Sequence, residues 1–142
     1  MHHIIKTENV LFELNKEGVS IKLIDFSLSR KYGLRDGAMK TRVGTPYYMS
    51  PDIIWGKYDR SCDLWAVGVL SYILLWGYPP FNGPSDYKVH ESILGGNLQF
   101  EKDVWGHLSN ASRDFVSKIL CMDSSKIVSV EEALHHPWIA ST

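Results

Sequence analysis

The residues that could do chemistry lie in one short N-terminal segment and in one tripeptide further along the chain. The segment, residues 2–9, carries Lys6, Glu8 and Asn9, and the tripeptide begins with Asp25. Position 4 of the segment holds isoleucine. An isoleucine side chain has no lone pair, so it can neither accept a proton nor bind a cation.

The short motifs of the chain follow one another in a defined order. They are His2 to Asn9, Asp25-Phe26-Ser27, Gly44-Thr45-Pro46-Tyr47-Tyr48, Ser50-Pro51-Asp52, Asp63-Leu64-Trp65-Ala66-Val67-Gly68, Gly77-Tyr78-Pro79-Pro80-Phe81 and His136-Pro137-Trp138. The first occupies the place of H-R-D-L-x-x-x-N, the second that of D-F-G and the fourth that of A-P-E. The chain therefore resembles the C-terminal lobe of a serine/threonine protein kinase over essentially its whole length. The runs 73–81 and 131–138 are most similar to the calcium-dependent and calmodulin-dependent group.

The resemblance implies roles for the residues that would surround a transferred phosphate. Ile4 stands in the place of the catalytic aspartate, and a positioned general base typically contributes about 10²–10⁴ in rate. Lys6 corresponds to the residue that contacts the phosphate, and Asn9 and Asp25 correspond to the magnesium ligands. An alternative for Asn9 is a turn-forming residue at the start of a strand.

The resemblance also implies substrate and regulatory positions. Glu8 matches a carboxylate that contacts a substrate arginine in basophilic kinases; a solvated loop carboxylate is the alternative. Thr45 falls on the substrate side of the site. Thr41 stands where some relatives carry an activating phosphothreonine, and His3 replaces the arginine that grips that phosphate. Because imidazole is mostly neutral near pH 7, it is a poor substitute for guanidinium, and phosphorylation of Thr41 is not expected to act as the usual switch.

Two aspartates match structural positions of the family. Asp63 corresponds to a residue that accepts backbone hydrogen bonds from the catalytic loop. Asp52 replaces a glutamate that forms a buried ion pair with an arginine, and Ile127 stands in the place of that arginine. Losing one partner of a buried pair costs about 3–5 kcal/mol. We therefore expect Asp52 to reach another donor or solvent.

Substitutions fall on five signature positions: His3, Ile4, Ser27, Asp52 and Ile127. Ser27 stands where D-F-G has its glycine, and only glycine tolerates positive φ freely. Five substitutions indicate a scaffold that is retained while the chemistry has decayed.

Composition excludes several other classes of protein. The net charge is −1 over 142 residues, with no Lys/Arg cluster, which argues against nucleic-acid binding. No apolar run is long enough for a membrane span, and no signal peptide is recognisable. Cys62 and Cys121 have no motif spacing, so we expect reduced thiols and a cytoplasmic protein. His135 and His136 are adjacent, and no further residues are spaced with them for zinc.

The elements that would position these residues follow from local pattern. Short strands are expected at 10–12 and 21–24 around a turn at 15–18, and a long surface loop at 27–45. A helix is expected from Ser61, as its cap, to Trp76, with an apolar surface nearly all round. Further helices are expected at 85–94 and at 109 or 110–122. Ser129 and Glu132 form a capping box for a last helix that ends near His136.

These elements predict a mainly α fold with a short β-hairpin region near the N-terminus. The expectation is a kinase-like fold limited to the C-terminal lobe: one partial domain over residues 1–142, from catalytic loop to final helix, without the N-terminal lobe. The Gly-rich loop, the lysine strand and EF-hand loops have no counterpart in the sequence. No cofactor is expected for this chain, although the resemblance implies Mg-ATP.

Three functional hypotheses follow. The first is a degenerate, pseudokinase-like lobe that scaffolds or regulates other proteins. The second is part of an active calcium-dependent Ser/Thr kinase, and the third is a stand-alone protein-interaction module. An uncovered apolar surface, which the N-terminal lobe would otherwise hide, predicts protein partners or self-association, with no nucleic acid and no membrane.

Overall fold

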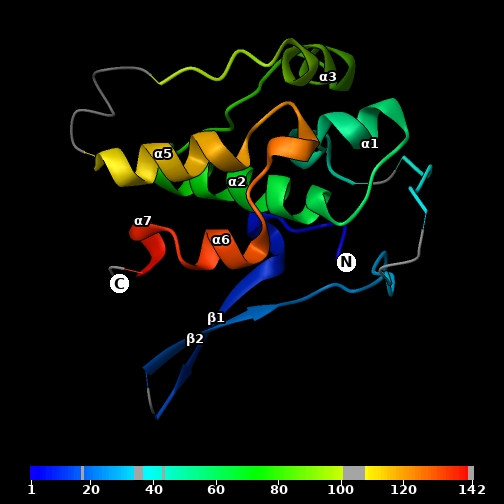
Figure 1. Cartoon of the computed structure of the whole chain (residues 1–142). Coiled ribbons are helices and arrows are strands. Elements are labelled where there is room, and N and C mark those ends of the chain that lie inside the picture. The colour runs from blue at the N-terminus through cyan, green and yellow to red at the C-terminus, as the bar shows by residue number, and fades with distance from the viewer. Residues whose placement is uncertain (17, 34–36, 43, 101–107, 141–142) are drawn as a thin grey trace.

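The structure, a computed structural model, describes residues 1–16, 18–33, 37–42, 44–100 and 108–140 (Figure 1). Its α-helices are Pro51–Trp55 (α1), Ser61–Trp76 (α2), Asp86–Gly95 (α3), Asn110–Ile119 (α5), Val130–Leu134 (α6) and Pro137–Ala140 (α7). Two antiparallel strands, Val10–Asn15 (β1) and Gly18–Leu23 (β2), form a hairpin. Three 3₁₀ turns are Thr7–Asn9 (η1), Pro46–Tyr48 (η2) and Ser124–Lys126 (η3). The chain is thus a small α-rich domain with an N-terminal hairpin, which agrees with the predicted class.

The helix α2 runs through the centre of the domain. It packs along α5, while α1 and α3 lie on one side of this pair and α6 and α7 on the other (Figure 1). Trp65, Val69 and Tyr72 of α2 are almost fully buried. A Cβ at Gly68 would stand 2.6 Å from a methyl carbon of Ile119, so glycine allows α2 and α5 to approach closely. The predicted helix therefore has the predicted bounds, and it contributes Trp65, Val69, Tyr72 and Trp76 to the main core.

The hairpin projects away from the helices and has one apolar face (Figure 1). Residues paired across antiparallel strands share a face. The pairs Val10–Leu23, Phe12–Ile21 and Leu14–Val19 are therefore all on the same side. Leu14 is 84% exposed and Phe12 is 74% exposed. We define these six side chains as the hairpin face.

Helix ends confirm most of the sequence signals. Ser129 and Glu132 form a reciprocal capping box at the start of α6, and Ser85 accepts a hydrogen bond from a first-turn amide of α3. The prediction that Ser61 caps α2 is wrong. Asp59 performs this function, because its carboxylate accepts a hydrogen bond of 2.8 Å from the Ser61 amide.

Several other segments differ from their predicted extents. The strands predicted at 10–12 and 21–24 occupy Val10–Asn15 and Gly18–Leu23. The helix α5 ends at Ile119, three residues before the predicted Met122, and Leu120 has already left helical geometry with ψ 40°. In the predicted loop 27–45, Met39 is buried and pairs with Tyr58 through backbone hydrogen bonds of 2.8 and 3.1 Å. Residues 34–36 and 43 of that loop lie outside the described residues. Among the helices that the structure describes, none is long and apolar enough to cross a membrane.

Candidate functional site

The N-terminal segment is held in place by one carboxylate of α2. Asp63 accepts hydrogen bonds from the backbone amides of His2 at 2.7 Å and His3 at 2.9 Å. His3 has φ 72°, a left-handed conformation that is uncommon outside glycine. The two bonds to Asp63 help to hold this conformation. Residues with unusual backbone geometry that the surrounding structure fixes are concentrated at functional sites.

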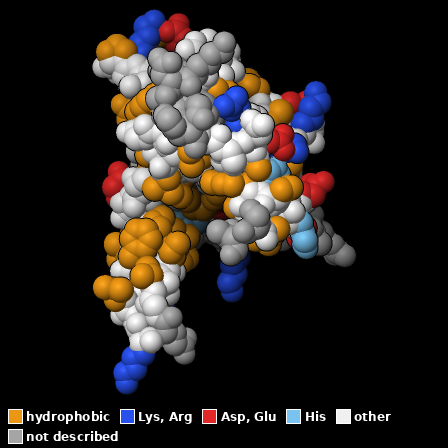
Figure 2. Space-filling model, turned by 90° about the vertical axis from the view of Figure 1, so that its left-hand side faces the viewer, with side chains coloured by type: hydrophobic (Ala, Val, Ile, Leu, Met, Phe, Trp, Pro, Cys, Tyr) orange, Lys and Arg blue, Asp and Glu red, His pale blue; other side chains and the backbone are white. Residues whose placement is uncertain are grey.

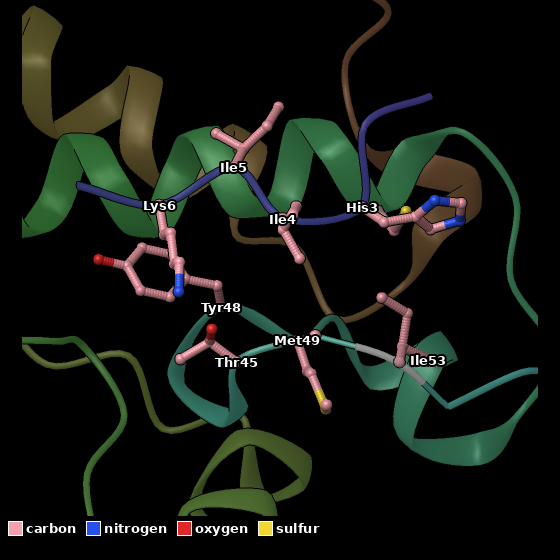
Figure 3. Close-up of a pocket in the computed structure, with 10 residues that line it drawn as sticks. His3, Ile4, Ile5, Lys6, Thr45, Tyr48, Met49 and Ile53 are labelled. Atoms are coloured by element: carbon pink, nitrogen blue, oxygen red, sulfur yellow. The ribbon is translucent and has the colours of Figure 1, made fainter. Parts of the chain in front are cut away.

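The side chain of Ile4 is 8% exposed and lines a small cavity of about 10 Å³, close to the volume of one water molecule (Figure 3). In Figure 3, Ile4 points toward Met49 and Ile53, whereas Ile5 points the other way. The cavity is lined by His3, Ile4, Ile5, Lys6, Gly44, Thr45, Tyr48, Met49, Ile53 and Cys62. None of these lining residues is a carboxylate. The position predicted for the catalytic base is therefore an apolar contact.

Lys6 and Thr45 come together at the other end of this cavity, next to the ring of Tyr48 (Figure 3). The hydroxyl of Tyr48 lies 3.1 Å from the hydroxyl of Thr7 and 3.4 Å from the Thr7 amide. The sequence predicted no role for Thr7 or Tyr48. The two residues are 41 positions apart, and no local pattern indicates that they are in contact. Through this contact η2 is attached to the N-terminal segment.

Glu8 lies on the surface in η1. Hydrogen bonds from its own backbone amide and from the Thr7 hydroxyl at 2.9 Å lower the pKa of its carboxyl. The group is therefore ionised at neutral pH and accessible to a cation such as a substrate arginine. The predicted substrate role of Glu8 stays a prediction.

A backbone hydrogen bond at the base of the hairpin joins Asn9 to the residue before Asp25. The carbonyl of Asn9 accepts a hydrogen bond of 2.9 Å from the amide of Ile24, which immediately precedes Asp25. The side-chain amide of Asn9 is buried and donates to the carbonyl of Ile4 at 2.8 Å. The side-chain nitrogen of Asn9 thus makes a structural contact, while its side-chain oxygen takes no part in this bond. The predicted role of Asn9 as a magnesium ligand stays a prediction.

The carboxylate of Asp25 is exposed, and Ser27 bonds to it twice. One oxygen accepts from the Ser27 hydroxyl at 2.6 Å and from the Ser27 amide at 3.2 Å. These bonds lower the pKa of Asp25. Asp25 has φ 63°, whereas Ser27 has an ordinary negative φ. Serine therefore fits this backbone without strain, and its hydroxyl contacts the predicted metal ligand.

The donor set fits a weak magnesium site of two protein ligands. One ionised carboxylate and one amide oxygen are ligand types that Mg²⁺ accepts, and it usually takes its remaining ligands from water and phosphates. Within the described ranges, no three His, Cys, Asp or Glu side chains gather as a metal-binding group. Asp25 and Asn9 would therefore hold the ion only together with a phosphate ligand.

Thr41, the predicted regulatory residue, is exposed and lines a groove of about 320 Å³ that it shares with His3 and Arg30. Sequence reasoning paired Thr41 with His3 and missed Arg30, which belongs to no motif. One imidazole nitrogen of His3 lies 2.8 Å from the carbonyl of Leu28, and the other is buried without a hydrogen-bond partner in the described part of the chain. The regulatory role of Thr41 stays a prediction.

Asp52 is half-buried in the first turn of α1, where the helix dipole favours a negative charge. No salt bridge joins it to any described residue. Ile127, which stands where the family has an arginine, packs against the main core. The two substitutions thus replace an ion pair with one helix-terminal carboxylate and one apolar contact.

The remaining candidates from the sequence are structural. His136 bonds to Asp114 at 3.0 Å and also accepts from the amide of Trp138, and His135 contacts the carbonyl of Glu131 at 2.7 Å. Both imidazoles therefore contribute to the packing around α6 and α7.

Burial strongly raises the pKa of Cys62, so this thiol stays protonated and unreactive.

Comparison with known proteins agrees with this arrangement. Residues 1–139 match the family described as "Protein kinase domain". The chain is 43% identical over 137 residues to Calcium-dependent protein kinase 3 of Plasmodium yoelii yoelii, a match that covers 96% of this chain and 26% of the relative. It is 40% identical over 140 residues to Calcium-dependent protein kinase 4 of Plasmodium falciparum, covering 98% of this chain and 26% of that protein.

A third relative is Myosin light chain kinase A of Dictyostelium discoideum, which is 37% identical over 142 residues. That match covers 99% of this chain and 48% of the relative. The chain thus spans about a quarter of the length of the calcium-dependent kinases and about half of the length of the myosin light chain kinase.

Proposed function

The chain belongs to the protein kinase domain family and is by origin related to the calcium-dependent Ser/Thr protein kinases, and from this premise we propose that it is a degenerate kinase lobe that binds other proteins without transferring phosphate. The observation that carries the proposal is the apolar burial of Ile4. A kinase needs a carboxylate beside the attacking hydroxyl. Here the corresponding side chain is 8% exposed, in a cavity with no lining carboxylate.

Among the described residues that line this cavity, none supplies a carboxylate that could take over the role of the base. The carboxylate of Asp63 is engaged elsewhere, because its two oxygens accept hydrogen bonds from the backbone amides of His2 and His3. His3 lines the cavity, but one of its nitrogens is occupied by the carbonyl of Leu28 and the other is buried. A substrate hydroxyl therefore meets no accessible proton acceptor at this end of the site.

The second candidate function is an active calcium-dependent type kinase. It is favoured by the retention of Lys6, Asn9 and Asp25 and by the kinase names of the relatives. Because the chain spans about a quarter of those relatives, the decisive assay uses the longest product that the gene encodes.

The experiment measures phosphate transfer from Mg-ATP to a basic peptide by four proteins: the native protein, Ile4→Asp, Asp25→Asn and the double variant. We expect the native protein and Asp25→Asn to be indistinguishable from buffer. Transfer by Ile4→Asp that disappears in the double variant would trace the loss of activity to position 4. Transfer by the native protein that Asp25→Asn abolishes would overturn the proposal and establish the second candidate.

The binding role is supported by the hairpin face. An isolated two-stranded hairpin is marginally stable in water, and its stability increases when its apolar face is covered. Hydrophobic side chains cover the projecting hairpin and continue into the hollow beside it (Figure 2). Exposed apolar patches of this kind mark sites of protein interaction. We therefore assign the hairpin face to a protein partner or to a second copy of this chain.

Sedimentation of the 142-residue chain tests this role. We expect association or capture of a hydrophobic dye, and both should weaken when Phe12 and Ile21 are changed to Ser. The matched control is Leu74→Ser, which removes a side chain of similar exposure, 71%, from α2. A native chain that stays monomeric and binds no dye would count against interaction through the hairpin face and leave the assay of phosphate transfer unaffected.

A further inference from the structure

A second apolar surface lies on the opposite side of the domain from the hairpin, between α1 and α3 (Figure 1). The groove has a volume of about 490 Å³ and is lined by Arg42, Ile54, Trp55, Tyr87, His90, Glu91 and Leu94. Trp55 is 58% exposed and Tyr87 is 71% exposed. Large aromatic side chains on opposite walls of a groove are characteristic of binding hot spots, because they bury a large area at low entropic cost.

Neither aromatic side chain is needed for the fold of the described chain. Trp55 is the last residue of α1, and Gly56 ends this helix in a left-handed conformation with φ 78°. Tyr87 is in the first turn of α3, whose buried residues are Val89 and Ile93. Both side chains thus lie on the outer surfaces of helices whose inner surfaces are already packed.

Arg42 is the one Lys or Arg side chain among the lining residues of the groove. Glu91, the one carboxylate among the lining residues, is neutralised by Lys88 at 2.6 Å. A Cβ at Gly56 would lie 3.7 Å from the guanidinium of Arg42 and 3.8 Å from the Lys40 carbonyl, so the segment 40–42 runs beside the end of α1. Lys57 follows on the same turn. Within the ranges that the structure describes, Lys40, Arg42 and Lys57 form no salt bridge.

We propose that this groove, which we call the α1–α3 groove, binds an acidic peptide segment of a partner protein that carries a large apolar anchor. The anchor lies between Trp55 and Tyr87, and the carboxylates of the segment meet Arg42 with Lys40 and Lys57. This occupant satisfies the unpaired cations and covers both aromatic rings. The proposal names one class of partner, and it holds whether or not the lobe transfers phosphate.

A random-peptide display library, selected on the immobilised chain at low salt, tests the proposal. We expect enriched sequences that combine an aromatic residue or leucine with two or more carboxylates. An enriched peptide is then labelled with fluorescein and titrated by anisotropy without nucleotide. Its dissociation constant should rise about tenfold or more in Trp55→Ser, in Tyr87→Ser and in Arg42→Glu, as expected for hot-spot residues. Added salt should weaken it, because exposed charges are screened.

The controls are matched by residue type and exposure. Leu74→Ser removes an exposed side chain from α2, and Lys16→Glu reverses an exposed charge at the hairpin turn. Both should bind the peptide as the native chain does. Because Trp55 and Tyr87 are exposed, their variants should keep the native melting temperature, which separates lost binding from lost folding.

Three outcomes would overturn the proposal. These are enrichment of basic or uncharged sequences, no enrichment at all, and enriched peptides whose binding is unchanged in the three groove variants. If the groove variants instead abolish sedimentation of the chain as a dimer, the occupant is a second copy and the acidic-peptide proposal is wrong. None of these outcomes depends on the phosphate-transfer assay, so failure here is distinguishable from failure of the proposed function.

Discussion

The side-chain amide of Asn9 donates a hydrogen bond of 2.8 Å to the backbone carbonyl of Ile4, and both residues are buried. The predicted metal ligand is thus bonded to the residue that replaces the catalytic base. This bond closes the turn between the N-terminal segment and β1. The side-chain amide of Asn9 therefore has a structural contact that does not depend on a bound ion.

Asn9→Ala should destabilise the domain by about 1–3 kcal/mol, because the buried carbonyl of Ile4 loses its donor. Asn9→Asp should also destabilise it, since a carboxylate keeps a metal-binding oxygen but cannot donate. Urea unfolding measures both effects, with the exposed Asn97→Ala as control. Native stability in Asn9→Asp would contradict a structural role for the amide.

Asp63→Ala should lower the free energy of unfolding, measured with urea, by about 2–4 kcal/mol. The reason is that hydrogen bonds to a charged acceptor are each stronger than neutral ones. The amides of His2 and His3 lose their acceptor together. Asp86→Ala, which removes an exposed carboxylate from the first turn of α3, is the control and should cost no more than about 1 kcal/mol. Equal losses in the two variants would argue against the anchoring role of Asp63.

Gly68→Ala should lower the melting temperature. The new Cβ would meet Ile119 at 2.6 Å and Leu120 at 2.9 Å, and overpacking costs about 1–3 kcal/mol, which exceeds the gain of about 1 kcal/mol in helix propensity. Gly95→Ala is the matched control, because Gly95 is also helical and has no atom within 4 Å of a new Cβ. It should be neutral or stabilising.

Stability should fall on acidification below about pH 4.5, and part of this fall belongs to Glu132. Hydrogen bonds from Ser129 lower the pKa of Glu132 from its usual value of 4.5. A group whose pKa is lower in the folded state stabilises the fold above its unfolded pKa, and this contribution is lost as the pH falls through the folded pKa. Glu132→Gln keeps an acceptor without the charge, so its melting temperature should depend less on pH between 5 and 3. An unchanged dependence of the melting temperature on pH would show that the capping box does not contribute to the loss of stability in acid.

Millimolar Mg-ATP should produce little thermal stabilisation of this chain, because Asn9 and Asp25 supply only two ligands. Ligand at 100 times its dissociation constant would add about 2.7 kcal/mol, which calorimetry detects readily. A concentration-dependent rise in melting temperature that Asp25→Asn removes would show retained nucleotide binding.

The fold was predictable where its signals are local. The bounds of α2 and α3 and the capping box of α6 follow from residues within one or two turns, and the structure confirms them. The predicted cap Ser61 failed because the helix already begins at Ser61, whose own amide donates to Asp59, two residues earlier. A choice between two neighbouring acceptors depends on backbone geometry, which the sequence pattern does not specify.

Sequence motifs predicted roles for Ile4, Asn9 and Asp25, and these roles stay predictions. The contacts between the residues were not predictable. The bond from Asn9 to Ile4 and the approach of Arg30 to Thr41 depend on how loops fold back. Contacts between loops leave no periodic pattern in the sequence, so they cannot be predicted from neighbouring residues.

The bonds from Asp63 to His2 and His3 also have a consequence for biosynthesis. A ribosome adds about 5–20 residues per second. The residues at positions 2 and 3 therefore leave the ribosome seconds before their acceptor, which lies 61 and 60 residues later. During that interval the amides of His2 and His3 lack the carboxylate that they bond in the folded domain. The N-terminal segment can therefore take its final conformation only after α2 has emerged.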